Sequence, residues 1–147
     1  YHPLGQRGIG LTSASGFGYA PDALDFVAYL QSANSETLLL PQCETAECLK
    51  NIEEIASVEG IDGIFIGPMD LSAALGKTGQ FDTPEFAAAL AKVQKACKEA
   101  GKYCFIYGLN AQSASTLFAQ GMDSVAVSLD AVVYVEAYKR LLAEIKR

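Results

Sequence analysis

The stretch "GIFIGPMDLSAALG", residues 63–76, decides how this chain folds. It opens with an apolar run typical of a buried strand and then breaks at Gly67-Pro68. A carboxylate follows at Asp70, and the residues after it have the composition of a short helix. A strand that turns directly into a helix is typical of a parallel α/β fold. An acid at the mouth of a hydrophobic strand is costly unless a positive group pairs with it.

The same alternation of strand and helix recurs along the chain. Short apolar runs predict strands over 36–44, 62–67, 102–108 and 123–130. Amphipathic segments predict helices over 21–33, 45–60, 83–101, 110–119 and 131–146. We expect the first strand to be covered on both faces. Strands that alternate with helices imply parallel pairing with right-handed crossovers.

Two helices carry clear end signals. Thr45 is expected to cap the helix over 45–60 and Gly60 to end it, with an apolar face of Leu49, Ile52, Ile55 and Ala56. Thr83 and Pro84 are expected to begin the helix over 83–101 and Gly101 to end it, with a buried stripe of Phe86, Leu90, Val93 and Cys97.

Four βα units are half of the eight that a closed (β/α)8 barrel needs. The 147 residues suit a single domain, with a loop and helix over 1–35 and the four units over 36–147. The chain is therefore either a small open α/β sheet or half of a barrel whose other half is absent or supplied by a second chain. It begins at Tyr1 and not at Met, so we expect a fragment or a processed product.

Composition excludes several classes of protein. The net charge of −6 argues against a nucleic-acid surface, which needs clustered Lys and Arg. No apolar run approaches the roughly 20 residues of a membrane helix, and no signal peptide is visible. The four cysteines form no C-x-x-C pair, and His2 is the only histidine. We therefore expect reduced thiols in a cytoplasmic protein and no structural zinc site.

Polar side chains follow every predicted strand: Gln42 and Glu44, then Asp70, then Tyr107 and Asn110, then Ser128 and Asp130. Parallel folds place their sites at these strand ends. Glu44 and Asp70 follow neighbouring strands, so their carboxylates could converge on a hard cation such as Mg²⁺ or Mn²⁺. Backbone N–H groups at the helix start near Asp70 would favour an anion, such as a 2-oxo acid. The alternative is that Asp70 is only a helix N-cap and Glu44 only a solvated loop acid.

Three blocks of this sequence, "YHPLGQRGIG" (1–10), "PQCE" (41–44) and "GPMDLS" (67–72), resemble the metal-dependent class II pyruvate aldolases of the HpcH/HpaI aldolase family. The resemblance implies a (β/α)8 barrel, of which this chain resembles the second half. By resemblance, Glu44 and Asp70 are metal ligands, for Mg²⁺ or Mn²⁺ and with Co²⁺ or Zn²⁺ also possible. Substrate-binding residues by the same resemblance are Gln42, Gly67, Pro68, Met69 and Asp70. Arg7 matches an arginine near the catalytic site, and the alternative is a structural surface arginine.

The activity implied by the resemblance is that of an aldehyde-lyase, which cleaves a 4-hydroxy-2-oxo acid to pyruvate and an aldehyde. The family's general base, a His–Asp pair, and its enolate-stabilising arginine come from the first half of the barrel. No residue here stands in for them, so we expect this chain alone to be inactive. The alternatives are a non-catalytic half-barrel that binds a metal or oxo acid, and a lyase of the citrate or malyl-CoA type.

The last predicted helix points to self-association. Val133, Ala137 and Leu141 form one apolar stripe, which is broadened by Tyr134, Tyr138 and Ile145. This face is wider than packing on one sheet requires. The resemblance likewise implies a homo-oligomer that uses its terminal helices, with a small-molecule 2-oxo acid as substrate. The alternative is that the tyrosine rings only cap the edge of the core.

Overall fold

The computed structural model describes residues 1–9 and 25–145. The chain divides into two compact units, Tyr1–Leu38 and Leu39–Arg147. The N-terminal unit contains helix α1 (Phe26–Glu36), whose first turn is capped by the Asp25 carboxylate, which accepts a hydrogen bond from the Ala28 N–H at 3.0 Å. The first residues of the helix expected over 21–33 lie outside the described part of the chain, and α1 runs past its expected end.

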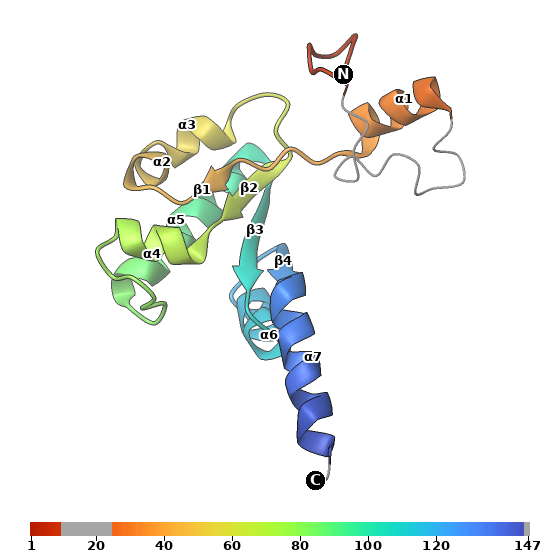
Figure 1. Ribbon diagram of the computed structural model, residues 1–147. Helices are drawn as coiled ribbons and strands as arrows, with labels where there is room; N and C mark the ends of the chain where they lie inside the picture. Colours follow the sequence, from red (N-terminus) through yellow and green to blue (C-terminus); the bar gives the residue numbers. More distant parts are fainter. Residues whose placement is uncertain (10–24, 146–147) are drawn as a thin grey trace. The chain divides into compact units, whose positions relative to one another are not determined.

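The C-terminal unit contains a parallel sheet of four strands in sequential order, with helices between them (Figure 1). The strands are β1 (Gln42–Cys43), β2 (Gly63–Ile66), β3 (Tyr103–Gly108) and β4 (Ser124–Val127). The helices are α2 (Ala46–Lys50), α3 (Ile52–Ala56), α4 (Pro68–Ala74), α5 (Pro84–Ala100), α6 (Ala111–Ala119) and α7 (Asp130–Glu144). Sequential parallel order is what a segment of a (β/α)8 barrel requires, and it confirms the predicted α/β class.

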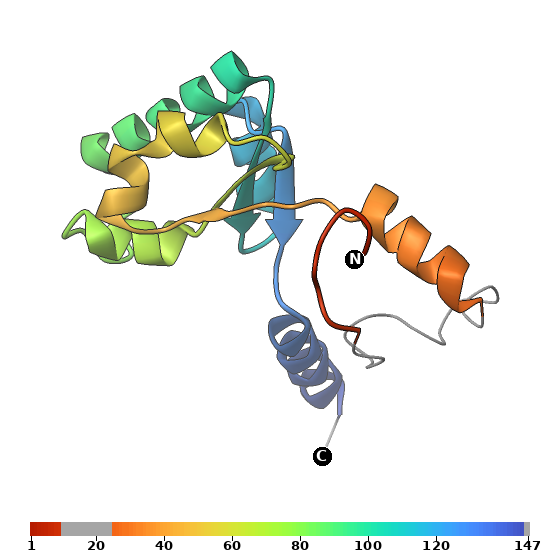
Figure 2. The ribbon, with the colours of Figure 1, turned by 90° about the horizontal axis from the view of Figure 1, so that it is seen from above.

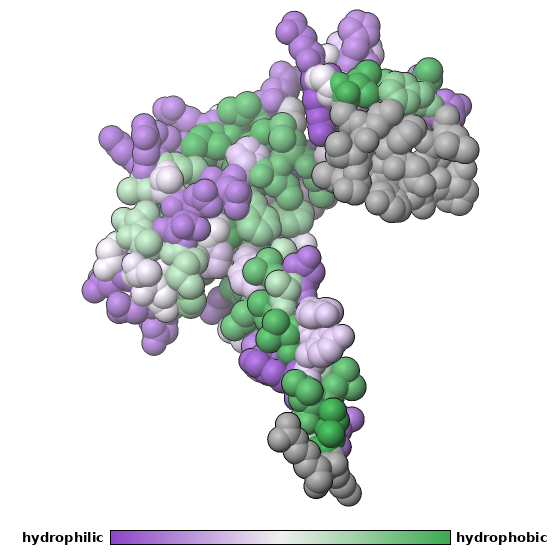
Figure 3. Space-filling view, viewed as in Figure 1, coloured by the Kyte–Doolittle hydropathy of each residue, from purple (hydrophilic) through white to green (hydrophobic). Residues whose placement is uncertain are grey.

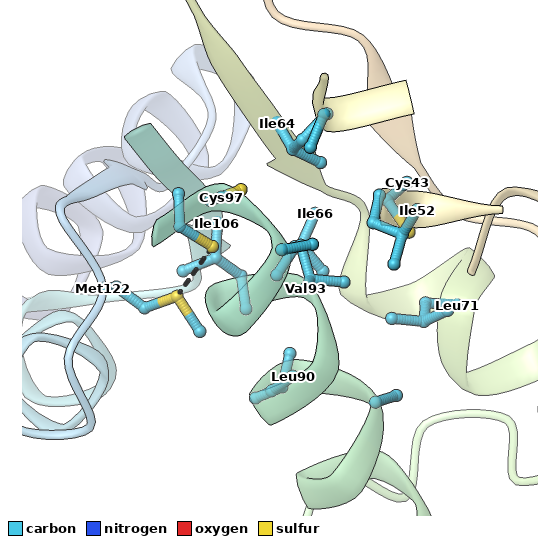
Figure 4. Close-up of a cluster of buried hydrophobic side chains, with 14 of the residues drawn as sticks. Cys43, Ile52, Ile64, Ile66, Leu71, Leu90, Val93, Cys97, Ile106 and Met122 are labelled. Carbon is cyan, nitrogen blue, oxygen red and sulfur yellow. Dashed lines mark hydrogen bonds between the residues drawn. The ribbon is translucent and has the colours of Figure 1, made fainter. Parts of the chain in front are cut away.

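The register of the sheet separates a helix-covered face from a more open one. Ile64 pairs with Cys104 and Ile66 with Ile106, and all these side chains are buried in the core drawn in Figure 4. Because successive side chains point to opposite faces, the residues between them lie on the other face. There Gln42, Phe65, Phe105 and Ser124 pair in one row across the four strands, and none is fully buried.

Helix α5 supplies much of the core and behaves as predicted. Thr83 accepts a hydrogen bond from the Phe86 N–H at 3.3 Å, Pro84 begins the helix, and Gly101 ends it at φ 67°. The predicted stripe of Phe86, Leu90, Val93 and Cys97 is buried. Helix α3 lies beside α5 on the same side of the sheet (Figure 2), and it buries Ile52 and Ala56 completely.

The first strand is much shorter than predicted. Leu38 and Leu39 are exposed, and only Cys43 of β1 is buried, so the expectation of a strand covered on both faces over 36–44 is wrong. β1 is an edge strand with a neighbour on one side only. The Leu39 N–H donates to the Asp62 carboxylate at 2.7 Å, and the Leu39 carbonyl oxygen accepts from the Asp62 N–H at 2.9 Å, so the backbone pairing here is only one-sided. Pro41 has no N–H to give, which further limits pairing at this edge.

The helix predicted over 45–60 is two short helices. Thr45 caps α2 as expected, because its hydroxyl accepts from the Cys48 N–H at 3.1 Å. The chain then breaks at Asn51, at φ −100° and ψ 18°, and α3 ends at Ala56 and not at Gly60. Asparagine favours such breaks because it stabilises helix interiors poorly. Gly60 instead serves the following turn at φ 89°.

Helix α7 has no buried residue. Apolar side chains gather along it in the space-filling view (Figure 3). Tyr134 is 63% exposed and Tyr138 is 51% exposed, so the alternative that these rings cap the core is wrong. No helix within residues 1–9 and 25–145 is long and apolar enough to span a bilayer.

Candidate functional site

Glu44 lies at the carboxyl end of β1, beside the backbone of Gly67, where the chain leaves β2. Cys43 pairs with Ile66, which sets Glu44 level with Gly67, and the Gly67 N–H donates to the Cys43 carbonyl oxygen at 3.3 Å. A Cβ placed on Gly67 would lie 2.9 Å from Glu44 Oε2 and 3.2 Å from Glu44 Cβ. The missing side chain of Gly67 therefore makes the space in which the half-buried Glu44 carboxylate lies.

Asp70 lies in the first turn of α4 and is exposed. Gly67 is the N-cap and Pro68 the first helical residue, so the alternative that Asp70 is only an N-cap is wrong. Neither the Glu44 nor the Asp70 carboxylate forms a hydrogen bond or an ion pair with any residue in the described ranges. The two carboxylates thus follow adjacent parallel strands, and their oxygens are not engaged by another described side chain.

The chemistry of these donors fits a hard divalent cation. Mg²⁺ and similar ions are commonly bound by one or two carboxylates, with water and substrate oxygens completing the shell. The neighbouring Cys43 thiol is fully buried in the core, on the face opposite to Glu44, and burial raises its pKa to about 12. Among the described residues no group of three or more His, Cys, Asp or Glu side chains is arranged to hold a metal. A cation here would rely on Glu44, Asp70 and non-protein oxygens.

The other predicted site residues divide between the two units. Gln42 is exposed and shares the open face of the sheet with Glu44, two residues further on. Met69 is 54% exposed at the start of α4. Arg7 belongs to the N-terminal unit, where its guanidinium carbon lies 5.0 Å from the centre of the Tyr1 ring. Its role near the site stays a prediction.

Asn110 is used structurally. Its side chain accepts from the Ser113 N–H at 2.9 Å, and the Ser113 hydroxyl accepts from the Asn110 N–H at 3.0 Å. This reciprocal pair caps helix α6, and the spacing of the two residues in the sequence could have revealed it. Asn110 is therefore removed from the candidate ligands at the strand ends.

A recess of about 870 Å³ lies on the helix side of the sheet, between α5 and α6. Its apolar wall includes Phe86, Leu90 and Leu117, and Pro68 and Met69 border it at the start of α4. Neither Glu44 nor Asp70 lines this recess. The carboxylate pair is therefore separate from this recess, and its interpretation rests on the geometry of the strand ends.

Gly67→Ala provides a test of the Glu44 environment. The new methyl group would meet Glu44 at 2.9 Å and 3.2 Å, so the carboxylate has to move away. We expect Mn²⁺ affinity to fall about tenfold, since displacing supporting groups of a metal site commonly costs about 10–100-fold. Isothermal titration measures this, with Gly8→Ala as control because nothing lies within 4 Å of a Cβ there. Parent-like affinity in Gly67→Ala would show that Glu44 binds no metal from this position.

Known proteins match nearly the whole length of this chain. The family model described as HpcH/HpaI aldolase/citrate lyase matches residues 1–137. A 4-hydroxy-2-oxo-heptane-1,7-dioate aldolase of Shigella sonnei is 41% identical over 145 residues, which are 97% of this chain and 53% of that protein.

Solved structures of the same family also match nearly the whole chain. An HpcH/HpaI aldolase/citrate lyase family protein from Burkholderia cenocepacia superposes with a TM-score of 0.73 at 33% identity, covering 97% of this chain and 53% of the other. An HpcH/HpaI aldolase from Desulfitobacterium hafniense gives a TM-score of 0.71 at 25% identity, covering 99% and 56%. These neighbours are of the TIM-barrel type, and the chain spans about half the length of the curated relatives it matches. The chain belongs to the HpcH/HpaI aldolase/citrate lyase family.

Proposed function

We propose that this chain is the metal- and oxo-acid-binding half of an aldehyde-lyase that cleaves a 4-hydroxy-2-oxo acid to pyruvate and an aldehyde. The observation that carries the proposal is the pair of carboxylates, Glu44 and Asp70, at the carboxyl ends of the adjacent strands β1 and β2. The matched relative from Shigella sonnei is named as an aldolase for such a substrate, which supports the choice of reaction.

Each site residue has a role in this proposal. Glu44 and Asp70 hold a divalent cation, Mg²⁺ or Mn²⁺ before Co²⁺ or Zn²⁺, which supplies Lewis-acid stabilisation of enolate charge when bound. Gln42 and the backbone N–H groups of Met69 and Asp70, in the turn that begins at Gly67 and Pro68, orient the carboxylate of the 2-oxo acid. Pro68 fixes φ at the first helical position, so the N–H groups after it keep their direction. Arg7 is proposed as a site residue only from its match to the arginine of the family's upstream motif.

The general base is proposed to lie in the part of the relatives that this chain does not span. The 4-hydroxyl must lose a proton for the carbon–carbon bond to break, and a positioned base does this. His2 is the only histidine of the sequence and belongs to a different motif, so we do not assign it this role. We therefore expect this chain to bind the cation and the oxo acid without cleaving a carbon–carbon bond.

Isothermal titration tests the binding half of the proposal. Pyruvate should bind the chain in the presence of saturating Mn²⁺ and should give no heat of binding when EDTA removes the cation. Pyruvate binding that is equally tight in EDTA would contradict a site built around a metal. The same titration distinguishes the main alternative, a lyase for CoA-linked substrates, because acetyl-CoA would then compete with pyruvate.

A second candidate is a half-barrel that binds metal and oxo acid without turnover. It is favoured by one observation, the lack of a second histidine in the sequence to serve as the family's base. This candidate predicts the same titration result but no activity even when the remainder of a relative is supplied. Activity restored by adding the N-terminal half of the Shigella sonnei aldolase would exclude it.

The exposed face of α7 supports a homo-oligomer. Val133 is 58% exposed and Leu141 is 57% exposed, and such apolar stripes are normally covered. We expect sedimentation at micromolar concentration to give species larger than the 15.6 kDa monomer. Leu141→Lys should reduce the assembly, whereas Ala143→Lys, on the polar side of the same helix, should not. A single 15.6 kDa species for the parent chain would contradict the prediction.

The four free cysteines support a proposal for the cellular compartment of this protein. Cys43, Cys97 and Cys104 are buried and free, and Cys48 is free and partly buried. Unpaired cysteines at this number are typical of reducing compartments, so we place the protein in the cytoplasm.

A further inference from the structure

Ser72 is the one buried polar side chain among the described residues, with no exposed surface. Its hydroxyl donates to the Met69 carbonyl oxygen at 2.7 Å and accepts from the Gly79 N–H at 2.9 Å. Its own carbonyl oxygen accepts from the Lys77 N–H at 2.8 Å. One residue of α4 therefore joins the first turn of that helix to the segment that follows it.

The segment joined to Ser72 is a tight turn over residues 76–80. The Gln80 N–H donates to the Lys77 carbonyl oxygen at 2.8 Å, and Gly79 adopts φ 73°, which a glycine accepts without strain. The turn leads into Phe81, whose ring lies 5.4 Å from that of Phe86 on α5. Through this turn, Ser72 connects α4 to the helix that supplies much of the core.

Helix α4 has only two buried residues, Leu71 and Ser72. Leu71 belongs to the apolar core (Figure 4), and apolar packing has little directional preference. The hydrogen bond from the Gly79 N–H to the Ser72 hydroxyl is directional and ties α4 to the following turn, so it restricts rotation of the helix about its axis, whereas the bond to Met69 lies within α4. Asp70 precedes these two residues in the same turn, so the rotation of α4 decides where its carboxylate lies relative to Glu44.

We propose that Ser72 is a positioning residue that sets the rotation of α4, and with it the placement of the Asp70 carboxylate for metal binding. This inference rests on the proposed function, because it assigns Ser72 to the same cation site. Ser72 does not touch the cation; it acts through the Met69 carbonyl and the turn at Gly79.

A matched control exists on another helix. Ser115 of α6 also donates to a carbonyl oxygen of its own helix, that of Ala111 at 3.0 Å. Such back-bonding is common for serine in helices. Ser115 is exposed and has no bond to a following turn within the described residues. Ser115→Ala therefore removes the local bond alone, whereas Ser72→Ala also removes the bond from the Gly79 N–H and leaves the backbone bond from Lys77 in place.

The test compares Mn²⁺ affinity and amide exchange in the parent chain, Ser72→Ala and Ser115→Ala. We expect Ser72→Ala to weaken Mn²⁺ binding about tenfold, in the range of about 10–100-fold found for groups that orient metal ligands. Hydrogen exchange at the Gly79 amide should accelerate in the same variant. Ser115→Ala should match the parent in both measurements.

The outcomes are distinguishable. A parent chain that binds no Mn²⁺ overturns the proposed function, and the role of Ser72 in metal binding falls with it. A parent chain that binds Mn²⁺ with Ser72→Ala equally tight overturns the role of Ser72 alone, as does an unchanged Gly79 exchange rate. If Ser72→Ala does not fold, Ser72→Cys keeps a weaker donor in nearly the same space. It should then lose affinity by a smaller factor, and full parent affinity with unchanged exchange would overturn the inference.

Discussion

Glu44→Ala and Asp70→Ala should each abolish binding of Mn²⁺ by this chain. Each replacement removes one of the two carboxylates proposed as oxygen ligands at the strand ends. Two unit charges about 4 Å apart near a protein surface attract by roughly 4 kcal/mol, which corresponds to about a thousandfold in affinity. Titration calorimetry, or displacement of a fluorescent chelator, should show binding falling below detection in both variants while the far-ultraviolet circular dichroism stays that of the parent.

The chain offers close controls for both acids. Glu47 is exposed in the first turn of α2, three positions after Glu44, and Asp82 is exposed after the turn that follows α4. Glu47→Ala and Asp82→Ala remove the same charge from the same neighbourhood and should leave Mn²⁺ affinity nearly unchanged. If the controls weaken binding as much as the site variants, the cation is held by the general negative field and not by Glu44 and Asp70.

The purified chain should show little or no aldol cleavage. It carries the proposed cation ligands but no candidate for the base, and general base catalysis typically contributes about 10²–10⁴-fold. When a base and a metal act as a unit, removing one of them removes most of the rate enhancement that both provide, so this chain should cleave substrate very slowly. Pyruvate release from a 4-hydroxy-2-oxo acid, followed by coupled reduction to lactate, should be at least about a hundredfold below that of the complete Shigella sonnei relative.

Robust pyruvate release by the 147-residue chain alone would contradict this prediction. The chemistry would then be performed by residues other than those assigned. A control with EDTA separates the two kinds of failure, because activity that persists without a cation would also remove Glu44 and Asp70 from the reaction.

The elements predicted well are those with strong local signals. α5 has a capping threonine, a proline in its first turn and a terminal glycine, and its apolar stripe repeats at helical spacing. Strands β2 and β3 are central and bury the side chains of their helix-covered face, so their apolar runs reflect the core that they help to form. The elements predicted poorly lie where tertiary context decides. Strand β1 is shortened by its edge position, and α2 and α3 separate at Asn51.

The candidate site was predictable in part for the same reason. Glu44 and Asp70 follow adjacent strands, and parallel strands end at the same edge of the sheet, so their place at one edge follows from topology. The space that Gly67 leaves for Glu44 depends on a register that the sequence does not state. The bond from Gly79 to Ser72 joins backbone to a buried hydroxyl and has no pattern of its own. Both contacts could be found only in three dimensions.

The most direct test of the metal and oxo-acid site is nuclear magnetic resonance of ¹³C-labelled pyruvate in the presence of Mn²⁺ and this chain. Paramagnetic Mn²⁺ broadens nuclei that lie within a few ångströms of it. If the cation held by Glu44 and Asp70 binds the oxo acid, the carboxylate and carbonyl carbons should broaden with the parent chain. The same broadening should be lost with Glu44→Ala and kept with Glu47→Ala. Broadening that is identical for the parent and for Glu44→Ala would contradict the proposed site.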